Sequence, residues 1–197
     1  MKRYALFMIA ACVLALFPIW AMAAPVGKFT YVEGQVDVLT PGQAARAAKL
    51  GDEVNVGETL RTKSQSKAEV TFDDGNILRL AEKTAMEIKE YMVSQDRSSG
   101  ILSLSRGKIQ NIIKAAAGRI FGQDKKNRFE VHTPTAVVGV RGTDFFSYYL
   151  RGISGAIFQE GTGYGYNVNK PEDVKTIRSG QAMVVAGPDK VPVIKPA

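Results

Sequence analysis

The sequence is poor in two residues that catalysis and metal binding commonly use. It has one cysteine, Cys12, and one histidine, His132. Cys12 lies in an N-terminal apolar stretch that we expect to be removed, so the mature chain has neither disulfides nor thiolate chemistry. A metal site would therefore rest on carboxylates, and no stretch has the spacing of a calcium loop. We expect no metal and no cofactor.

The sequence also lacks the motifs of common active sites. It has no G-x-S-x-G elbow. The glycines of Gly161–Tyr166 lack the G-x-G-x-x-G spacing of a phosphate loop. His132 precedes Thr133-Pro134, where a surface or capping residue at the end of a strand is the better interpretation. We predict that the protein is not an enzyme. A secreted hydrolase that uses His132 as a base is the least favoured hypothesis.

The N-terminus has the pattern of a secretory signal. Lys2 and Arg3 precede a run from Tyr4 to Ala21 without a charged residue, and small residues flank Met22. This pattern predicts a signal peptide over residues 1–23, cut before Ala24, and a periplasmic or secreted product. The alternative is an uncleaved membrane anchor, since the run is nearly long enough to span a bilayer.

Cleavage would leave 174 residues, enough for one domain, and would lower the formal charge from +7 to +5. Export argues against a nucleic-acid partner. Anionic envelope polymers and lipid headgroups remain open as partners of the basic surface, and weak surface charge without a specific partner is the favoured interpretation. No second apolar span follows, so we expect no membrane span after cleavage. Residues 187–197 hold three prolines, and we expect an extended or disordered tail.

Short alternating segments separated by glycine dominate the mature chain. Ala68–Phe72 and Tyr164–Val168 alternate as half-buried strands do. Six glycines stand three residues after a core position, where a positive φ allows a sharp turn: Gly34, Gly57, Gly75, Gly107, Gly161 and Gly180. The pattern predicts an all-β fold. Because the spacing is irregular, both a β-helix-like solenoid with insertions and a β-sandwich remain open.

Two local segments receive specific predictions. Isoleucines and alanines recur at helical spacing after Lys108, which predicts one short helix near residues 109–117. Asp73-Asp74-Gly75-Asn76 is the nearest candidate for a cation loop. Since Asp-Gly between two strands is a strong hairpin signal, we interpret it as a turn.

The densest pattern lies between Phe129 and Phe146. Pro134 is expected to end one strand because it lacks a ladder donor. Ala136–Val140 reads as a strand buried on both faces. The guanidinium of Arg141 needs a partner if it is buried, and Glu160 is a candidate.

This segment resembles the core motif of the FecR domain, T-P-x-A-x-x-x-V-R-G-T-x-F. The matching residues are Thr133, Pro134, Ala136, Val140, Arg141, Gly142, Thr143 and Phe145. The resemblance extends over roughly residues 28–186, so we assign residues 24–186 to one FecR-like β domain. It also favours the solenoid over the sandwich.

The resemblance implies a role in envelope signalling. FecR-type sensors join a cytoplasmic anti-sigma segment, one membrane span and a periplasmic β-rich part with a terminal docking domain. Only three residues precede the apolar run here, and the chain stops soon after Val185. We therefore expect a stand-alone β-module without the anti-sigma segment.

Two binding hypotheses follow. The favoured one is an envelope protein partner that adds a strand to an exposed sheet edge. The alternative is an envelope polysaccharide or small ligand that stacks on tyrosine rings, with Tyr148, Tyr149, Tyr164 and Tyr166 as candidate contacts. Packing against neighbouring strands is the simpler explanation of these tyrosines.

Overall fold

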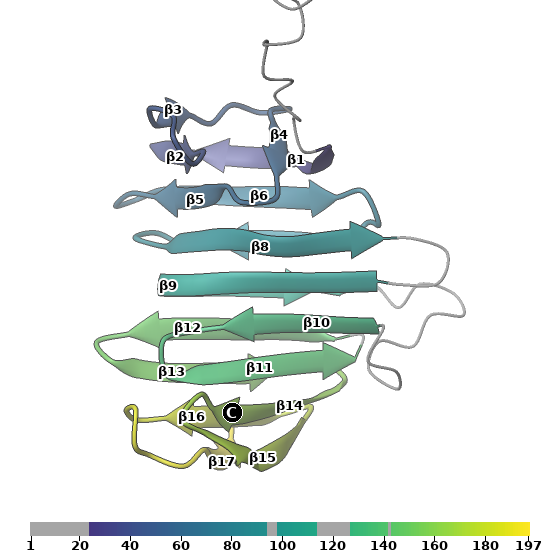
Figure 1. Ribbon diagram of the computed structural model, residues 1–197, viewed down its shortest axis with the longest axis vertical. Helices are drawn as coiled ribbons and strands as arrows, with labels where there is room; N and C mark the ends of the chain where they lie inside the picture. The colour runs from purple at the N-terminus through teal and green to yellow at the C-terminus, as the bar shows by residue number, and fades with distance from the viewer. Residues whose placement is uncertain (1–23, 94–97, 114–126, 142) are drawn as a thin grey trace, which may run out of the picture.

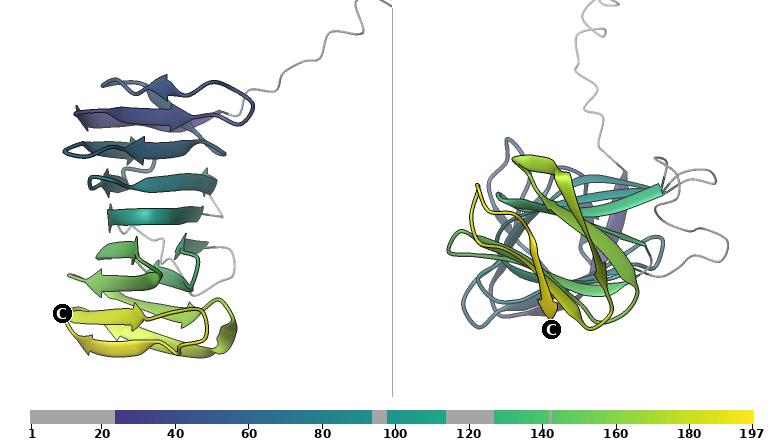
Figure 2. Two further views of the ribbon diagram at one scale, coloured as in Figure 1. Left: turned by 90° about the vertical axis from the view of Figure 1, so that its left-hand side faces the viewer. Right: turned by 90° about the horizontal axis from the view of Figure 1, so that it is seen from below.

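The structure is a computed structural model that describes residues 24–93, 98–113, 127–141 and 143–197 (Figure 1). The proposed signal peptide, residues 1–23, lies outside these ranges. The described residues form 17 strands and no helix, so the all-β prediction is confirmed. The strands stack along the long axis of the molecule in successive levels (Figures 1 and 2).

The pairings arrange the strands in two ladders, which we name by their position in Figure 1. The front ladder pairs nine strands in this order: β3 (Arg46–Ala47), β2 (Val36–Leu39), β5 (Thr59–Thr62), β8 (Ala85–Val93), β9 (Ser98–Ile112), β10 (Asn127–His132), β11 (Ala136–Arg141), β14 (Thr162–Asn167) and β15 (Lys170–Arg178). All neighbours in it are antiparallel except β9 and β10, which are parallel.

The back ladder is antiparallel throughout. Its order is β4 (Glu53–Asn55), β1 (Pro25–Glu33), β6 (Lys67–Phe72), β7 (Ile77–Leu80), β9, β12 (Asp144–Leu150), β13 (Ile153–Phe158), β16 (Gln181–Val185) and β17 (Val193–Pro196). Hairpins formed by consecutive strands alternate between the ladders, as β10–β11, β12–β13, β14–β15 and β16–β17 do. Neighbouring levels are therefore built from hairpins.

Strand β9 joins the two ladders into one mixed sheet. Its residues 98–106 pair in the front ladder and its residues 107–112 in the back ladder. Gly107 at the crossing has φ +97°, and a Cβ there would lie 2.5 Å from the Cα of Thr84. A side chain at position 107 would therefore clash with backbone at the point where the strand changes ladder.

Inward side chains of both ladders meet in one hydrophobic core. Phe145 of β12 packs edge-on against Phe129 of β10, with ring centroids 6.4 Å apart. Phe145 also stacks on Phe158 of β13 at 5.3 Å. All three rings are at most 2% exposed. The alternation of the strands thus produces a core that continues through the levels of the stack.

All six glycines singled out in the sequence have positive φ, from +73° to +97°. The Asp73–Asn76 segment is the turn of the β6–β7 hairpin, closed by the Gly75 amide donating to the Phe72 carbonyl at 2.8 Å. The turn interpretation of that segment is confirmed.

The helix predicted near residues 109–117 is wrong over its first turn. Residues 109–112 belong to β9, where Ile109 is buried and Gln110 is half-buried, in strand alternation. This segment pairs with β7 on one side and β12 on the other. Two ladders of hydrogen bonds outweigh a weak local helix preference. Residues 114–117 lie outside the described part of the chain.

The C-terminal tail differs from the expected disorder. Residues 193–196 form β17 against β16, and the Ala197 amide donates to the Gly180 carbonyl at 2.9 Å. The side-chain amide of Asn167, itself fully buried, donates to the carbonyls of Gly187, Pro188 and Lys190 at 2.7–3.2 Å. These bonds hold the segment of residues 187–190, which precedes β17.

No helix in the described ranges is long and apolar enough to cross a membrane.

Candidate functional site

The residues Thr133 to Ala136 of the family motif build the tight turn between β10 and β11. The Thr133 amide donates to the Ala136 carbonyl at 2.8 Å, and the Ala136 amide donates to the Thr133 hydroxyl at 3.0 Å. The hydroxyls of Thr133 and Thr135 both hydrogen-bond to the buried hydroxyl of Ser154 on β13. The turn is thereby tied to the back ladder.

The rest of the motif contributes to the core. Ala136, Val140 and Phe145 are at most 1% exposed, and Thr143 is buried at 3%. All five residues of Ala136–Val140 are buried, which confirms the prediction of a strand covered on both faces. Gly142 and the side chain of Arg141 lie outside the described part, and so does the expected contact between Arg141 and Glu160. The described motif residues therefore lie in the tight turn and in the core.

A polar cluster lies beside the motif on the outward face of the front ladder. Glu130 of β10 is 7% exposed. One of its carboxylate oxygens lies 2.7 Å from His132 Nε2, and the other accepts a hydrogen bond from the Tyr164 hydroxyl at 2.8 Å. Alternation on β10 places Glu130 and His132 on one face, and the register of β11 with β14 places Tyr164 opposite Gly139, beside Glu130.

The pKa shifts in this cluster follow from burial and from its hydrogen bonds. Burial acts to raise the pKa of Glu130, but the bonds from His132 and Tyr164 outweigh it and lower that pKa below its usual value. Burial, then the charge of Glu130, raises the pKa of Tyr164 well above its usual range. Burial and the charge of Glu130 also raise the pKa of Tyr166. Glu130 therefore stays ionised and both tyrosines stay neutral at ordinary pH.

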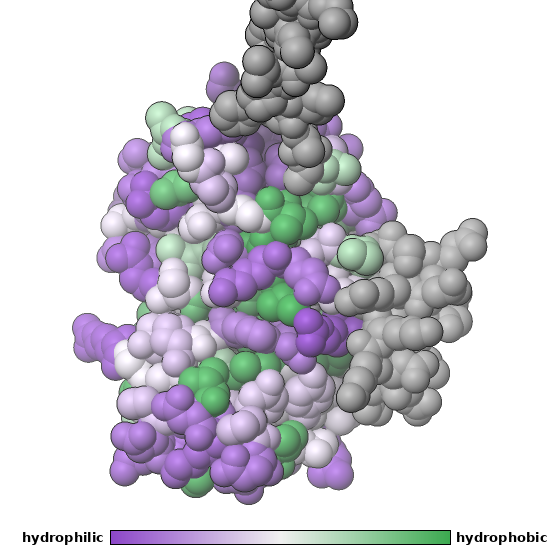
Figure 3. Space-filling view, in the orientation of Figure 1, coloured by the Kyte–Doolittle hydropathy of each residue, from purple (hydrophilic) through white to green (hydrophobic). Residues whose placement is uncertain are grey.

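Tyr164 and Tyr166 form a half-buried aromatic pair on β14. Their ring planes are parallel to within 4°, with centroids 6.5 Å apart. Tyr164 lies across Gly139 of β11, where a Cβ would come within 2.1 Å of the ring. The face of the molecule seen in Figure 3 is mostly hydrophilic with separate apolar spots. One face of the Tyr164 ring thus lies against β11, and both rings are partly accessible.

The structure does not bring the four predicted tyrosines together. Tyr148 and Tyr149 belong to β12 of the back ladder. Tyr148 covers Gly155 of the neighbouring strand β13, and Tyr149 packs against the core. The predicted aromatic contact surface is therefore limited to Tyr164 and Tyr166.

The end of the front ladder lies next to this pair. Among the described residues β15 pairs along one edge, with β14, and it lies at the end of the stack (Figure 1). It is nine residues long, and Val174 in its middle is 51% exposed. A small cavity of about 180 Å3 lies between the two strands, lined by Thr162, Gly163, Tyr164 and Thr176.

His132 has no nucleophile beside it among the described side chains. Its ring hydrogen-bonds to Glu130, while the neighbouring Thr133 hydroxyl is engaged with Ala136 and Ser154. A serine or threonine hydrolase needs the hydroxyl in contact with the base. Within the same ranges, no three histidine or acidic side chains gather as metal ligands.

Sequence reasoning missed Glu130 and the β15 edge. Glu130 stands two residues before His132 on an alternating strand, so a shared face could have been inferred. Its contact with Tyr164, 34 positions away, depends on the pairing of β11 with β14. The open edge of β15 likewise depends on strand order, which local patterns do not encode.

The fold has relatives of known structure. Two crystal structures of a protein from Parabacteroides distasonis ATCC 8503, described as a candidate anti-sigma factor, superpose on this chain with a TM-score of 0.54 each. Their sequences are 18% and 17% identical to it, and the match covers 70% of this chain and 59% of theirs. This chain therefore spans about three fifths of their length. A search of curated proteins gives no significant match.

Residues 58–162 match the family described as FecR protein. The matched range runs from the residue before β5 to the first residue of β14. It contains the whole T-P turn and Glu130, while Tyr164, Tyr166 and β15 lie beyond it. The match covers more than half of the sequence, and the chain belongs to the FecR family.

Proposed function

We propose that this protein is a non-enzymatic FecR-domain module of the cell envelope that binds a partner protein in signalling or assembly. The N-terminal pattern supports export by a signal peptide over residues 1–23 to the periplasm or beyond. Family membership and the fold shared with a candidate anti-sigma factor support a regulatory role.

The observation that carries this proposal is the open edge of β15. An unpaired strand edge presents a row of backbone N–H and C=O groups that another chain can pair with. Proline occurs in β15 only at Pro171, near its start, and residues 175–178 pair with β14 in unbroken register, so their alternate outward backbone groups form a regular edge. The other terminal strand, β17, has four residues, of which Pro196 is the last.

The described strands form one large mixed sheet whose levels are stacked between two ends, and on this basis we keep the solenoid of the sequence analysis as a proposal. A partner strand on β15 would add the next level of the front ladder. Its side chains would meet the outward row that contains Thr176 and Tyr164, which face each other across β14 and β15. Tyr164 and the small cavity beside it would then help select the partner.

A proline pair tests the strand-addition mechanism. Residues 175–178 of β15 pair in unbroken register with β14. Successive backbone N–H groups of a regular strand point to opposite edges, so of Lys175→Pro and Thr176→Pro one removes a donor to β14 and the other a donor on the open edge. We expect the variant that keeps the melting temperature of the wild type to lose its partner when the full chain is purified from its own envelope. Retention of the partner by that variant would contradict strand addition.

The parallel pair Tyr164–Tyr166 supports a second candidate, an envelope polysaccharide that stacks on the rings. Tyr166→Ala is the cleaner test because it leaves the Tyr164–Glu130 bond in place. We expect loss of retention on peptidoglycan or glycan columns, with unchanged folding by circular dichroism. Equal retention of Tyr166→Ala and wild type would remove this candidate.

A further inference from the structure

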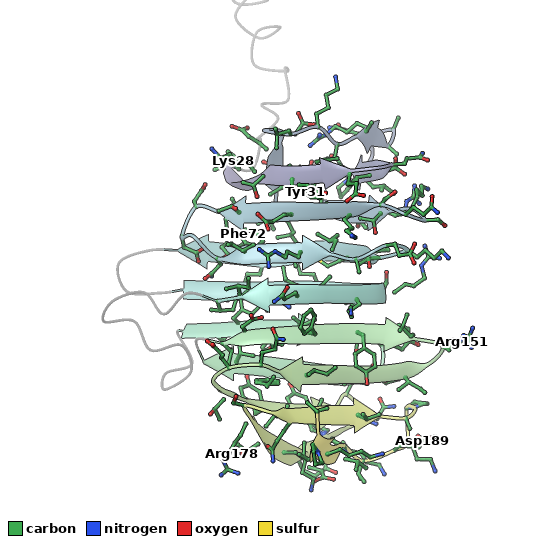
Figure 4. The ribbon with its side chains drawn as sticks, turned by 180° about the vertical axis from the view of Figure 1, so that it is seen from behind. Lys28, Tyr31, Phe72, Arg151, Arg178 and Asp189 are labelled. Carbon is green, nitrogen blue, oxygen red and sulfur yellow. The ribbon has the colours of Figure 1, made fainter. Side chains whose placement is uncertain are left out.

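A basic groove lies on the side of the stack where hairpin turns gather. Its volume is about 500 Å3. The lining residues come from four separate passes of the chain and none belongs to β14 or β15: Thr62, Lys63, Ser64, Lys83, Arg106, Leu150 and Arg151. Arg151 marks this edge of the molecule (Figure 4).

The four cations of the groove follow one another in successive levels. The Lys83 amide donates to the Lys63 carbonyl at 3.1 Å, and Arg106 Nε donates to the Lys83 carbonyl at 3.2 Å. Arg151 is in the β12–β13 turn, two residues beyond Tyr149, which pairs with Gly107. Levels of a sheet are about 5 Å apart, so the cations form a column of about 15 Å.

Most of this positive charge is not neutralised within the described part of the protein. Lys83, Arg106 and Arg151 have no carboxylate within ion-pair distance there, and all three are exposed. Lys63 contacts Asp37 at 3.2 Å, an aspartate that also pairs with Arg61. The nearby Glu82 accepts a hydrogen bond from the Gln65 amide at 2.8 Å.

Two of these cations occupy an unfavourable backbone conformation. Lys83 has φ +54° and Arg151 has φ +50°. Among the described residues only one other non-glycine residue, Gln65, has positive φ. Glycine and asparagine are the usual residues at such turn positions. Long basic side chains thus occur where the turn itself would favour small ones, a form of local strain that often accompanies binding sites.

We propose that this groove is a binding site for a ligand that carries several phosphoryl groups. A phosphoryl group accepts hydrogen bonds in several directions, which suits ammonium and guanidinium groups that converge from different levels. A column of four cations suits consecutive anionic groups better than a single ion. The site is independent of the partner edge on β15, so either proposal can fail without the other.

Titration calorimetry with sodium tripolyphosphate and the full chain tests the site. We expect binding that weakens as salt is raised, since exposed charges are screened. The triple variant Lys83→Asn, Arg106→Gln, Arg151→Asn should bind at least about tenfold more weakly, which corresponds to about 1.4 kcal/mol. Asparagine is chosen at positions 83 and 151 because it tolerates positive φ. If the triple variant does not fold, Arg106→Gln alone should weaken binding about threefold.

The matched control, Lys28→Gln, Lys89→Gln, Lys195→Gln, removes three exposed charges elsewhere and should bind within twofold of wild type. A second arm uses vesicles of phosphatidylcholine with and without phosphatidylglycerol. If the groove variant no longer binds the anionic vesicles and the control variant still does, the phosphoryl groups are those of a lipid. If the groove variant loses binding to tripolyphosphate but wild type does not bind the vesicles, the ligand is soluble. No binding by wild type in either arm, equal weakening in both triple variants, or equally tight binding of polygalacturonate would overturn the proposal.

Discussion

The two ends of the stack differ in how far their edge strands are covered. At the N-terminal end the edge strands β3 and β4 have two and three residues, and the segment of residues 40–52, which contains β3, is hydrogen-bonded to β1 and β2. The Gly51 amide donates to the Phe29 carbonyl at 2.9 Å, and the Ala48 amide donates to the Val36 carbonyl at 2.8 Å. At the C-terminal end the edge strand β15 is nine residues long.

A buried carboxylate fixes the closed end. Glu58, 3% exposed, accepts hydrogen bonds from the Thr40 hydroxyl at 2.8 Å and from the Asn55 amide at 2.9 Å. Arg46 lies 3.8 Å from it and pairs more closely, at 2.9 Å, with Asp52. Short edges and loops that cover them are the usual protection against pairing with other chains. Within the described ranges no loop covers the middle of β15, and this difference directs the functional proposal to the open end.

The largest expected effect tests whether both ends share one well-packed core. Phe29 and Phe158, at most 1% exposed, lie toward opposite ends. Phe29→Ala and Phe158→Ala should each lower the free energy of unfolding by about 3–5 kcal/mol, measured by chemical denaturation. If Phe158→Ala alone lowers the free energy of unfolding by less than about 1 kcal/mol, the core is loosely packed toward the open end.

The second effect should distinguish the ends. Glu58→Gln turns one acceptor into a donor that faces Thr40 or the Asn55 amide, so we expect a loss of about 1–3 kcal/mol in unfolding free energy. Glu172→Gln on the exposed side of β15 should change stability by less than about 0.5 kcal/mol. Stability is measured by thermal and denaturant unfolding. If Glu58→Gln and Glu172→Gln lower the free energy of unfolding by the same amount, Glu58 does not hold the closed end.

A third, smaller effect concerns the tail at the open end. Asn167→Ala removes three bonds to the segment of residues 187–190 and should cost about 1 kcal/mol. Hydrogen exchange should become faster in β17 and stay unchanged in β4. Asn169→Ala is the matched control, because its exposed side-chain amide donates one bond to Pro188. Unchanged exchange in β17 would show that the tail is held by its strand pairing alone.

The smallest effect is a pH dependence at the Glu130 cluster. Hydrogen bonds lower the pKa of Glu130 in the folded chain below 4.5, the ordinary value for glutamate. Its stabilising contribution is therefore complete above about pH 4.5 and is lost as the pH falls through the folded pKa. Glu130→Gln should reduce the loss of stability between pH 6 and pH 3, measured by urea unfolding. If Glu130→Gln and wild type lose stability equally between pH 6 and pH 3, Glu130 does not contribute to the pH dependence of stability.

Much of the fold was predictable because it is encoded locally. Alternating segments and glycines such as Gly34 and Gly75 predicted strands and turns, and the T-P turn followed from Pro134. The helix near residue 109 was wrong because pairing of β9 on both sides is a non-local effect. The C-terminal strand was missed because Asn167, which holds the segment before it, lies 20 or more positions away.

The site was predictable only in part, for the same reason. Alternation placed Tyr164 and Tyr166 on one face, and the structure keeps them together. Their distance from Tyr148, the contact with Glu130 and the open edge of β15 depend on which strands become neighbours. The groove could not be anticipated, because Lys63, Lys83 and Arg151 are brought together by the stacking of turns far apart in sequence.

Site-specific photo-crosslinking in the native envelope tests the central comparison most directly. A photoreactive residue replaces Val174 at the open end or Leu50, an exposed leucine near the closed end, in otherwise wild-type full chains. We predict that position 174 forms an adduct with one protein, identified by mass spectrometry, and that position 50 forms none. Adducts at position 50 but not at position 174, or none at either, would contradict the account.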